Sequence, residues 1–364
     1  MLATAADSAI ALRARLAACE ADKKLGAPVL DGADAARVER VVLALGKLGS
    51  RELNPSSDVD LLVVYGVDGT LASGSSAHEW HVMFARRLRA HLSDVDDDGF
   101  AFRVDYDLRP EGTAGPLANA VDALESYYER FGQTWERAAL LRLRAIEGAG
   151  DASLASTIER RLRPFVFPRT LDARAVDELF AMKHRVTASA DAGDAFDVKR
   201  GHGGIREVEF VVQANQLLNG GRLPDLRRGN VLELLARLEE HGLVPHRTSA
   251  ELAHGYELLR RIEHALQYGE DRQTQRLPSS GAEHDRVARA VMHAMLSSTR
   301  SRTHQQARSF GDELADARDK VHAAFTRLLG EDREQPSDDA RRALDRTLDD
   351  EARVRRLGAL GFHA

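Results

Sequence analysis

Residues 49–62 have the sequence Gly-Ser-Arg-Glu-Leu-Asn-Pro-Ser-Ser-Asp-Val-Asp-Leu-Leu, and this stretch decides the predicted fold of the 364-residue chain. Asp58 and Asp60 stand two residues apart at the start of an apolar run that continues to Tyr65. Alternate residues of a strand point to the same side, so the two carboxylates share one face. The run Val59–Tyr65 therefore predicts a buried strand that begins with a pair of acids.

Two further apolar segments predict neighbouring strands. Residues 41–45 are rich in valine and leucine and stop at a glycine, and residues 100–108 carry Asp105 between apolar and aromatic neighbours. Ionised carboxylates side by side repel each other, and Mg²⁺ relieves that repulsion because it prefers hard oxygen ligands and keeps positions open for phosphate. We predict that Asp58, Asp60 and Asp105 bind Mg²⁺ and form the catalytic centre of a phosphoryl or nucleotidyl transfer site, with Asp105 as third ligand or base. For an isolated Asp-x-Asp pair, the competing interpretation is a loop-to-strand boundary with solvated acids.

The turn before these acids has the composition of a phosphate-binding loop. Gly49 lacks a Cβ, which lets the backbone approach a triphosphate or pyrophosphate closely, and Ser50 adds a hydroxyl donor. Arg109 follows the third predicted strand and offers a planar donor for a phosphate. Its alternative role is a surface salt bridge with Glu111.

Beyond residue 115 the predicted strands give way to helical patterns. We predict a small mixed β-sheet domain over residues 1–115, an all-α helical bundle over residues 116–330, and a charged helical tail or linker over residues 331–364; the fold class is α+β. The predicted helices are 8–24 and 77–92 in the first domain, followed by 117–130, 133–147, 152–163, 172–190, 204–219, 229–241, 247–269, 282–299, 303–329 and 337–356.

Composition restricts the class of protein. A net charge of −6 argues against general nucleic-acid binding, which needs a basic surface. The lone Cys19 rules out an internal disulfide framework and suits a reducing cytoplasm. No apolar run reaches the length of a membrane span, and no signal-peptide pattern is present, so we expect neither membrane nor nucleic acid as a partner. His78 and His81 lie three residues apart on a predicted helix without a third ligand, and we predict that both are surface residues.

Several long stretches resemble one family of enzymes. The Gly-Ser turn, the Asp58-x-Asp60 pair and the later Asp105 are similar to the polymerase-β-type nucleotidyltransferase superfamily. More narrowly, the chain resembles the glutamine synthetase adenylyltransferase/adenylyl-removing enzyme family from about residue 41 to about residue 330. The stretches that carry this resemblance are Leu-Gly-Lys-Leu-Gly-Ser-Arg-Glu-Leu-Asn at 45–54, Val-Asp-Tyr-Asp-Leu-Arg-Pro-Glu-Gly at 104–112, Trp-Glu-Arg at 135–137, Arg-Leu-Arg at 142–144, Gly-Gly-Ile-Arg-Glu-Val-Glu-Phe-Val-Val-Gln at 203–213 and Leu-Arg-Arg-Ile-Glu-His-Ala-Leu-Gln at 259–267.

The resemblance implies a function. In that family each half of the protein carries a nucleotidyltransferase domain followed by a helical domain; one half attaches AMP to a tyrosine of glutamine synthetase, and the other removes it by phosphorolysis and releases ADP. The stretches at 135–137 and 204–207 are similar to the removing half. The resemblance thus implies Mg²⁺-dependent removal of AMP, glutamine synthetase as partner, a PII-type signalling protein as a second partner, and phosphate, ADP or ATP as ligands. The residues that we predict for nucleotide or phosphate binding are Gly49, Ser50, Ser57, Arg109 and Arg206.

Two alternatives stay open at this stage, namely the ATP-dependent adenylylating direction and a weakly active half with a regulatory or scaffold role. Asp107 favours the second, because the family usually has a basic residue there and a carboxylate would repel phosphate. The chain also begins shortly before the first motif and ends near the point where a second half would start. We therefore expect a detached half, a split-gene product or a fragment.

Overall fold

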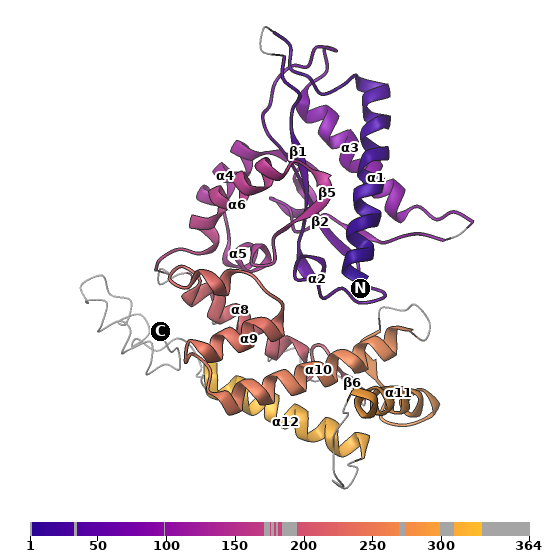
Figure 1. Ribbon diagram of the computed structural model, residues 1–364, viewed down its shortest axis with the longest axis vertical. Coiled ribbons are helices and arrows are strands. Elements are labelled where there is room, and N and C mark those ends of the chain that lie inside the picture. The colour runs from indigo at the N-terminus through magenta and orange to yellow at the C-terminus, as the bar shows by residue number, and fades with distance from the viewer. Residues whose placement is uncertain are drawn as a thin grey trace, which may run out of the picture. The chain divides into compact units, whose positions relative to one another are not determined.

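The computed structural model describes residues 2–32, 35–97, 99–170, 175, 178–179, 181–183, 195–268, 274–298 and 309–329. These residues belong to two compact units, Met1–Pro168 and Arg169–Ala364 (Figure 1). The first unit is a mixed sheet with helices and the second is mostly helical, which confirms the predicted α+β class.

The sheet of the first unit has five strands in its described part. They are β1 (Arg40–Ala44), β2 (Val59–Tyr65), β3 (Val104–Asp105), β4 (Ala118–Ala120) and β5 (Arg144–Gly150). Strand β2 pairs antiparallel with β1 and parallel with both β3 and β4, and β1 pairs antiparallel with β5 on its other side. Strand β2, which carries Asp60, is therefore interior to the sheet, as its apolar run predicts, whereas Asp58 lies one residue before the strand begins.

Helices cover both faces of this sheet (Figure 1). Helices α1 (Leu2–Leu25) and α3 (Ala77–Ser93) contact each other and share a buried apolar core with Val42, Leu61 and Val63. On the other face, α6 (Ala152–Val166) contacts β1 and also α4 (Val121–Arg130). Burial of each valine or leucine of β2 contributes about 1.5–3 kcal/mol, so both layers hold the acid-bearing strand firmly. The short elements of this unit are α2 (Gly46–Gly49), α5 (Thr134–Leu140) and the 3-10 turn Gly112–Ala114.

The sequence prediction is wrong at two strands and overestimates the length of a third. The predicted helix 133–147 ends after α5, and residues from Arg144 onward form β5; the predicted helix 117–130 begins with strand β4. The predicted third strand at 100–108 is reduced to the two residues that pair with β2. Because β5 completes the sheet beside β1, the first compact unit extends beyond the predicted boundary at residue 115 and reaches Pro168.

The second unit is a helical bundle in its described part. Helix α10 (His246–Tyr268) contacts four helices, namely α8 (Ile205–Asn219), α9 (Val231–Glu240), α11 (Ala282–Ser298) and α12 (Phe310–Leu329). A 3-10 turn spans Pro224–Arg227, and the short strands β6 (Phe196–Asp197) and β7 (Arg276–Leu277) pair with each other. Helical prediction is confirmed for these long segments. The predicted helix 337–356, the first residues of 303–329 and much of 172–190 lie outside the described residues.

One sequence prediction about α3 is wrong. His78 is exposed, but His81 is fully buried, stacked on the ring of Tyr65 with 4.3 Å between ring centroids. Its Nδ1 lies 2.7 Å from the carbonyl of Ala77, whereas Nε2 has no hydrogen-bond partner among the described residues. Burial lowers the pKa of His81 to about 4; the hydrogen bond with the Ala77 carbonyl opposes this shift and the positive charge of Arg40 adds to it. The imidazole is therefore neutral in the folded protein near pH 7.

This buried imidazole predicts acid sensitivity of the first unit. An unfolded histidine binds a proton near pH 6.5, whereas folded His81 binds one only near pH 4, so stability is full above about pH 6.5 and falls as the pH drops toward 4. The loss attributable to this group is about 3 kcal/mol. In H81N the amide can still donate to Ala77 without titrating, and the slope of unfolding free energy against pH should be shallower. Denaturant titrations that follow tryptophan fluorescence from pH 7.5 to 4 test this. An H81N slope equal to that of the wild type would contradict the assignment, and H78N controls for loss of an exposed imidazole on the same helix.

Candidate functional site

Two of the three predicted acids are neighbours across the sheet. Asp60 on β2 and Asp105 on β3 are paired residues in a parallel ladder, so their side chains leave the sheet on the same face. Asp105 accepts a hydrogen bond from the backbone N–H of Asp107 at 2.6 Å, which fixes one of its carboxylate oxygens. The sheet thus brings together two carboxylates that lie 45 residues apart in the sequence.

Asp58 is held differently. Its Oδ1 accepts a hydrogen bond from Nε of Arg103 at 2.7 Å, and the same guanidinium also donates to the carbonyl of Ser56. Sequence reasoning did not find Arg103, although its place one residue before β3 puts it beside the start of β2. Within the residues that the structure describes, no group of three or more His, Cys, Asp or Glu side chains is arranged to hold a metal. Binding of one Mg²⁺ ion by all three acids stays a prediction. The carboxylates of Asp60 and Asp105 are a pair of hard oxygen donors of the kind that Mg²⁺ prefers.

The turn before β2 packs directly against one of these acids. Gly46, the first residue of α2, has a φ of +51°, and a Cβ built on it would lie 2.0 Å from Oδ2 of Asp60. The backbone N–H of Leu45 also donates to the carbonyl of Asp60 at 2.9 Å. Only glycine combines this backbone conformation with room for the carboxylate. The place of Gly46 at the end of a strand run predicts a turn, but no sequence pattern indicates its contact with Asp60.

Gly49 has a packing role in this structure. A Cβ there would lie 1.9 Å from the carbonyl oxygen of Arg142, so the glycine lets the turn sit against the segment that leads into β5. The N–H groups of Gly49 and Ser50 donate to the carbonyls of Leu45 and Gly46, at 2.8 and 3.3 Å. What Ser50 offers to a phosphate is therefore its hydroxyl, which makes only long contacts of 3.3 and 3.4 Å with two carbonyls of the same turn.

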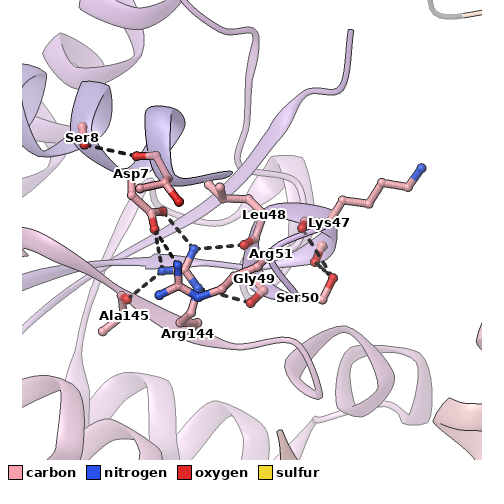
Figure 2. Close-up of polar contacts among 11 residues, drawn as sticks. Asp7, Ser8, Lys47, Leu48, Gly49, Ser50, Arg51, Arg144 and Ala145 are labelled. Atoms are coloured by element: carbon pink, nitrogen blue, oxygen red, sulfur yellow. Dashed lines mark hydrogen bonds and ion pairs between the residues drawn. The ribbon is translucent and has the colours of Figure 1, made fainter. Parts of the chain in front are cut away.

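A largely buried ion pair lies beside this turn (Figure 2). Arg144, the first residue of β5, binds both carboxylate oxygens of Asp7 on α1, at 3.0 and 2.8 Å. The same guanidinium donates to the carbonyls of Leu48 at 3.0 Å and Gly49 at 3.2 Å. Asp7 also lies 3.6 Å from a guanidinium nitrogen of Arg51, whose φ is +61°. No sequence pattern links residues 7, 48 and 144, although Arg144 lies in a stretch that carries the family resemblance.

Arg109 holds its own loop together. Its guanidinium donates to the carbonyls of Gly115, Tyr106 and Thr113 at 3.0, 3.0 and 3.1 Å, and the side chain is buried. Its carboxylate neighbour is Asp107 at 3.5 Å, not the Glu111 of the sequence-based alternative. These contacts give Arg109 a structural role in shaping the loop after β3, and its predicted contact with phosphate stays a prediction.

The remaining predicted binding residues lie apart from the turn or in the other unit. Ser57 is partly exposed in the loop before β2, and its N–H donates to the carbonyl of Asn54 at 3.3 Å. Arg206 is exposed on the first turn of α8 in the second unit. Neither role is tested by these contacts.

The residues that resemble the removing half have structural partners. Glu136 is buried, accepts a hydrogen bond from the hydroxyl of Tyr127 at 2.9 Å, and completes the capping box at the start of α5 with Gln133. The guanidinium of Arg137 lies over the ring of Phe165, 4.9 Å from its centroid. These contacts give Glu136 and Arg137 a role in supporting the fold.

Comparison with known proteins accounts for this arrangement. The family described as glutamate-ammonia ligase adenylyltransferase matches residues 1–160, which include every strand of the sheet and the turn before β2. A protein of Hahella chejuensis named bifunctional glutamine synthetase adenylyltransferase/adenylyl-removing enzyme is 39% identical over 300 residues, or 81% of this chain. The chain belongs to the glutamate-ammonia ligase adenylyltransferase family. The second unit carries a further likeness, because the family described as GlnD PII-uridylyltransferase matches residues 179–329.

Other members of the adenylyltransferase family are similar to this chain to the same degree. Proteins of the same name from Bordetella pertussis and Pseudomonas aeruginosa are 41% and 37% identical, over 70% and 88% of this chain. The chain spans 28–33% of the length of these three relatives. No helix among the described residues is long and apolar enough to cross a membrane.

Proposed function

We propose that this chain is a nucleotidyltransferase that removes AMP from adenylylated glutamine synthetase by Mg²⁺-dependent phosphorolysis and releases ADP. The observation that carries the proposal is the in-register pair of Asp60 and Asp105, beside a Gly-Ser turn, in a chain of the adenylyltransferase family. Phosphorolysis forms a bond between an oxygen of inorganic phosphate and the phosphorus of AMP, and the tyrosyl oxygen leaves and takes up the proton.

The residues of this chain have distinct parts in that reaction. Asp60 and Asp105 would hold Mg²⁺, which neutralises phosphate charge when it is bound. Asp58, paired with Arg103, ties the loop before β2 to the segment before β3, and its share in binding Mg²⁺ stays a prediction. The Ser50 hydroxyl is free to rotate toward a phosphate oxygen, because its contacts in the turn are long.

The proposal of the removing direction rests on the similarity of residues 135–137 and 204–207 to the removing half of the family. Asp107 is more than half exposed and lies close to Asp105 in the sequence, so its charge weakens the binding of phosphate. We therefore expect low activity that rises with Mg²⁺ concentration. We also propose a cytoplasmic location with glutamine synthetase, and a PII-type protein as second partner.

Two parallel assays test the reaction. Purified chain is incubated with adenylylated glutamine synthetase, Mg²⁺ and labelled phosphate, and separately with unmodified glutamine synthetase, Mg²⁺ and labelled ATP. We expect labelled ADP in the first assay and little label on glutamine synthetase in the second. Label from ATP on glutamine synthetase, without ADP release, would reverse the direction. If a well-folded chain gives neither labelled ADP nor labelled glutamine synthetase, a regulatory or scaffold role would be favoured.

A further inference from the structure

We propose that the buried ion pair of Asp7 and Arg144 is a positioning device that holds the Gly46–Ser50 turn in place for a phosphate group of the nucleotide. Asp7 belongs to α1, Arg144 to β5, and the turn to the connection between β1 and β2. The inference rests on the proposed function, and it gives the helix α1 a part in the reaction beyond covering the sheet.

The guanidinium of Arg144 connects Asp7 to the turn. Its three nitrogen atoms donate two hydrogen bonds to the carboxylate of Asp7 and one each to the carbonyls of Leu48 and Gly49 in the turn, at 2.8 to 3.2 Å, besides one at 3.3 Å to the carbonyl of the adjacent Ala145 (Figure 2). A guanidinium is planar and presents its donors in a fixed fork, so binding Asp7 in a bidentate manner also fixes the direction of the two bonds to the turn. The carboxylate therefore orients the arginine, and the arginine orients the turn.

The ion pair of Asp7 and Arg144 is largely shielded from solvent. The side chains of Arg144 and Asp7 are only 16% and 11% exposed. Removing both charges from water is costly, and an ion pair of this kind contributes little net stability compared with apolar residues of the same size. Its specific effect is geometric, because it determines where two carbonyls of one turn must lie.

The turn that Arg144 holds lies next to the proposed site. Gly46 lies against the carboxylate of Asp60, and Ser50 presents the hydroxyl that can reach phosphate. A shift of the Leu48 and Gly49 carbonyls would therefore move both the hydroxyl and the surface that Asp60 packs against. Asp7 and Arg144 touch neither substrate nor metal in this scheme, so both are positioning residues. Residues that orient catalytic groups in this way typically change affinity or activity by about 10–100-fold when they are substituted.

The test uses R144K and D7N in the full chain. Lysine keeps the charge of Arg144 but cannot bind Asp7 in a bidentate manner and reach two carbonyls as well; asparagine keeps the shape of Asp7 without its charge. The first readout is the binding of ADP with Mg²⁺ by calorimetry, where we expect affinity to fall at least about tenfold. The second is amide hydrogen exchange at residues 49–52, whose N–H groups all donate within the turn. We expect faster exchange there and unchanged exchange in β2.

The matched control is R161K. Arg161 likewise forms ion pairs within the first unit, here with two carboxylates, Asp122 and Glu125, but at the surface between α6 and α4. We expect R161K to leave both the affinity for ADP with Mg²⁺ and the exchange of the turn unchanged.

Each outcome decides the inference. Wild-type affinity in R144K and D7N would overturn it while leaving the proposed function intact. Faster exchange throughout α1 and the sheet would also overturn it, because the ion pair would then be a structural tie. A wild-type chain that does not bind ADP with Mg²⁺ would overturn the proposed function together with this inference. Weaker binding with faster exchange confined to the turn would support the positioning role.

Discussion

Asp60→Asn is expected to lower the rate of AMP removal by about 10³-fold while the fold stays intact. An amide is a much poorer ligand for Mg²⁺ than a carboxylate, and losing the charge compensation of a metal ion corresponds to several kcal/mol of transition-state stabilisation, or about three factors of ten. Asn is close to Asp in shape, so it fits against Gly46 without a new clash. Steady-state assays of phosphate-dependent ADP release measure the effect.

Stability separates loss of chemistry from loss of fold in this variant. Asp60 and Asp105 are paired residues on neighbouring strands, and neutralising one of them relieves the repulsion between the two carboxylates. Without divalent metal, D60N should therefore melt at the wild-type temperature or higher. D122N makes the same chemical change at an exposed carboxylate on α4 and should leave turnover unchanged. Undiminished turnover in D60N would refute the role of Asp60, and a lower melting point would point to a structural role instead.

Strand β2, which carries Asp60, is predicted correctly because its pattern is unambiguous. Val59–Tyr65 is an almost unbroken apolar run, and burial on both faces of the sheet requires such a run. The same local signal also predicts the helices of the second unit, whose apolar residues recur with helical spacing over many turns. In these segments the local pattern and the tertiary packing agree.

Strand β5 could not be predicted in this way. Its sequence, Arg-Ala-Ile-Glu-Gly-Ala-Gly, has little β propensity, and Gly148 and Gly150 have positive φ values. A Cβ on Gly150 would lie 2.4 Å from the Cα of Val41, so the glycine that weakens the strand pattern is what permits close pairing with β1. Tertiary pairing overrides local propensity there, and the predicted helix was wrong for that reason.

Some contacts of the candidate site can be predicted from local sequence patterns and others cannot. Strand patterns in the sequence predict that Asp60 and Asp105 lie on neighbouring strands, and the register of β2 with β3 makes them paired residues. The contacts of Asp7 with Arg144 and of Asp58 with Arg103 depend on side-chain reach between segments far apart in the chain. Periodicity carries no information about such contacts, which appear only once the elements are packed.

Gly46→Ala is expected to lower activity by about 10²-fold, although residue 46 offers no functional group. The new Cβ would lie 2.0 Å from Oδ2 of Asp60 and 2.8 Å from its Cγ, so the carboxylate must rotate away from its present position. Displacing a reacting or ligating group by about 1 Å is enough for an effect of about 10²-fold. Assays of ADP release and melting curves of the variant, compared with the wild type, give the size of the effect.

Backbone strain at residue 46 is the competing explanation for a loss of activity in G46A. Substitution of a second glycine with a similar backbone conformation measures the effect of that strain alone. Gly112 has a φ of +57°, close to the +51° of Gly46, but a Cβ on Gly112 would meet only the carbonyl of Asp107 at an ordinary 3.7 Å. Alanine in this conformation costs about 1–2 kcal/mol at either position, so G112A should lose similar stability and keep its activity. In a D60A background the clash is absent. Adding G46A there should lower the free energy of unfolding only by the cost of the backbone strain. Equal loss of activity in G112A and G46A would show that strain, rather than displacement of Asp60, disables the site.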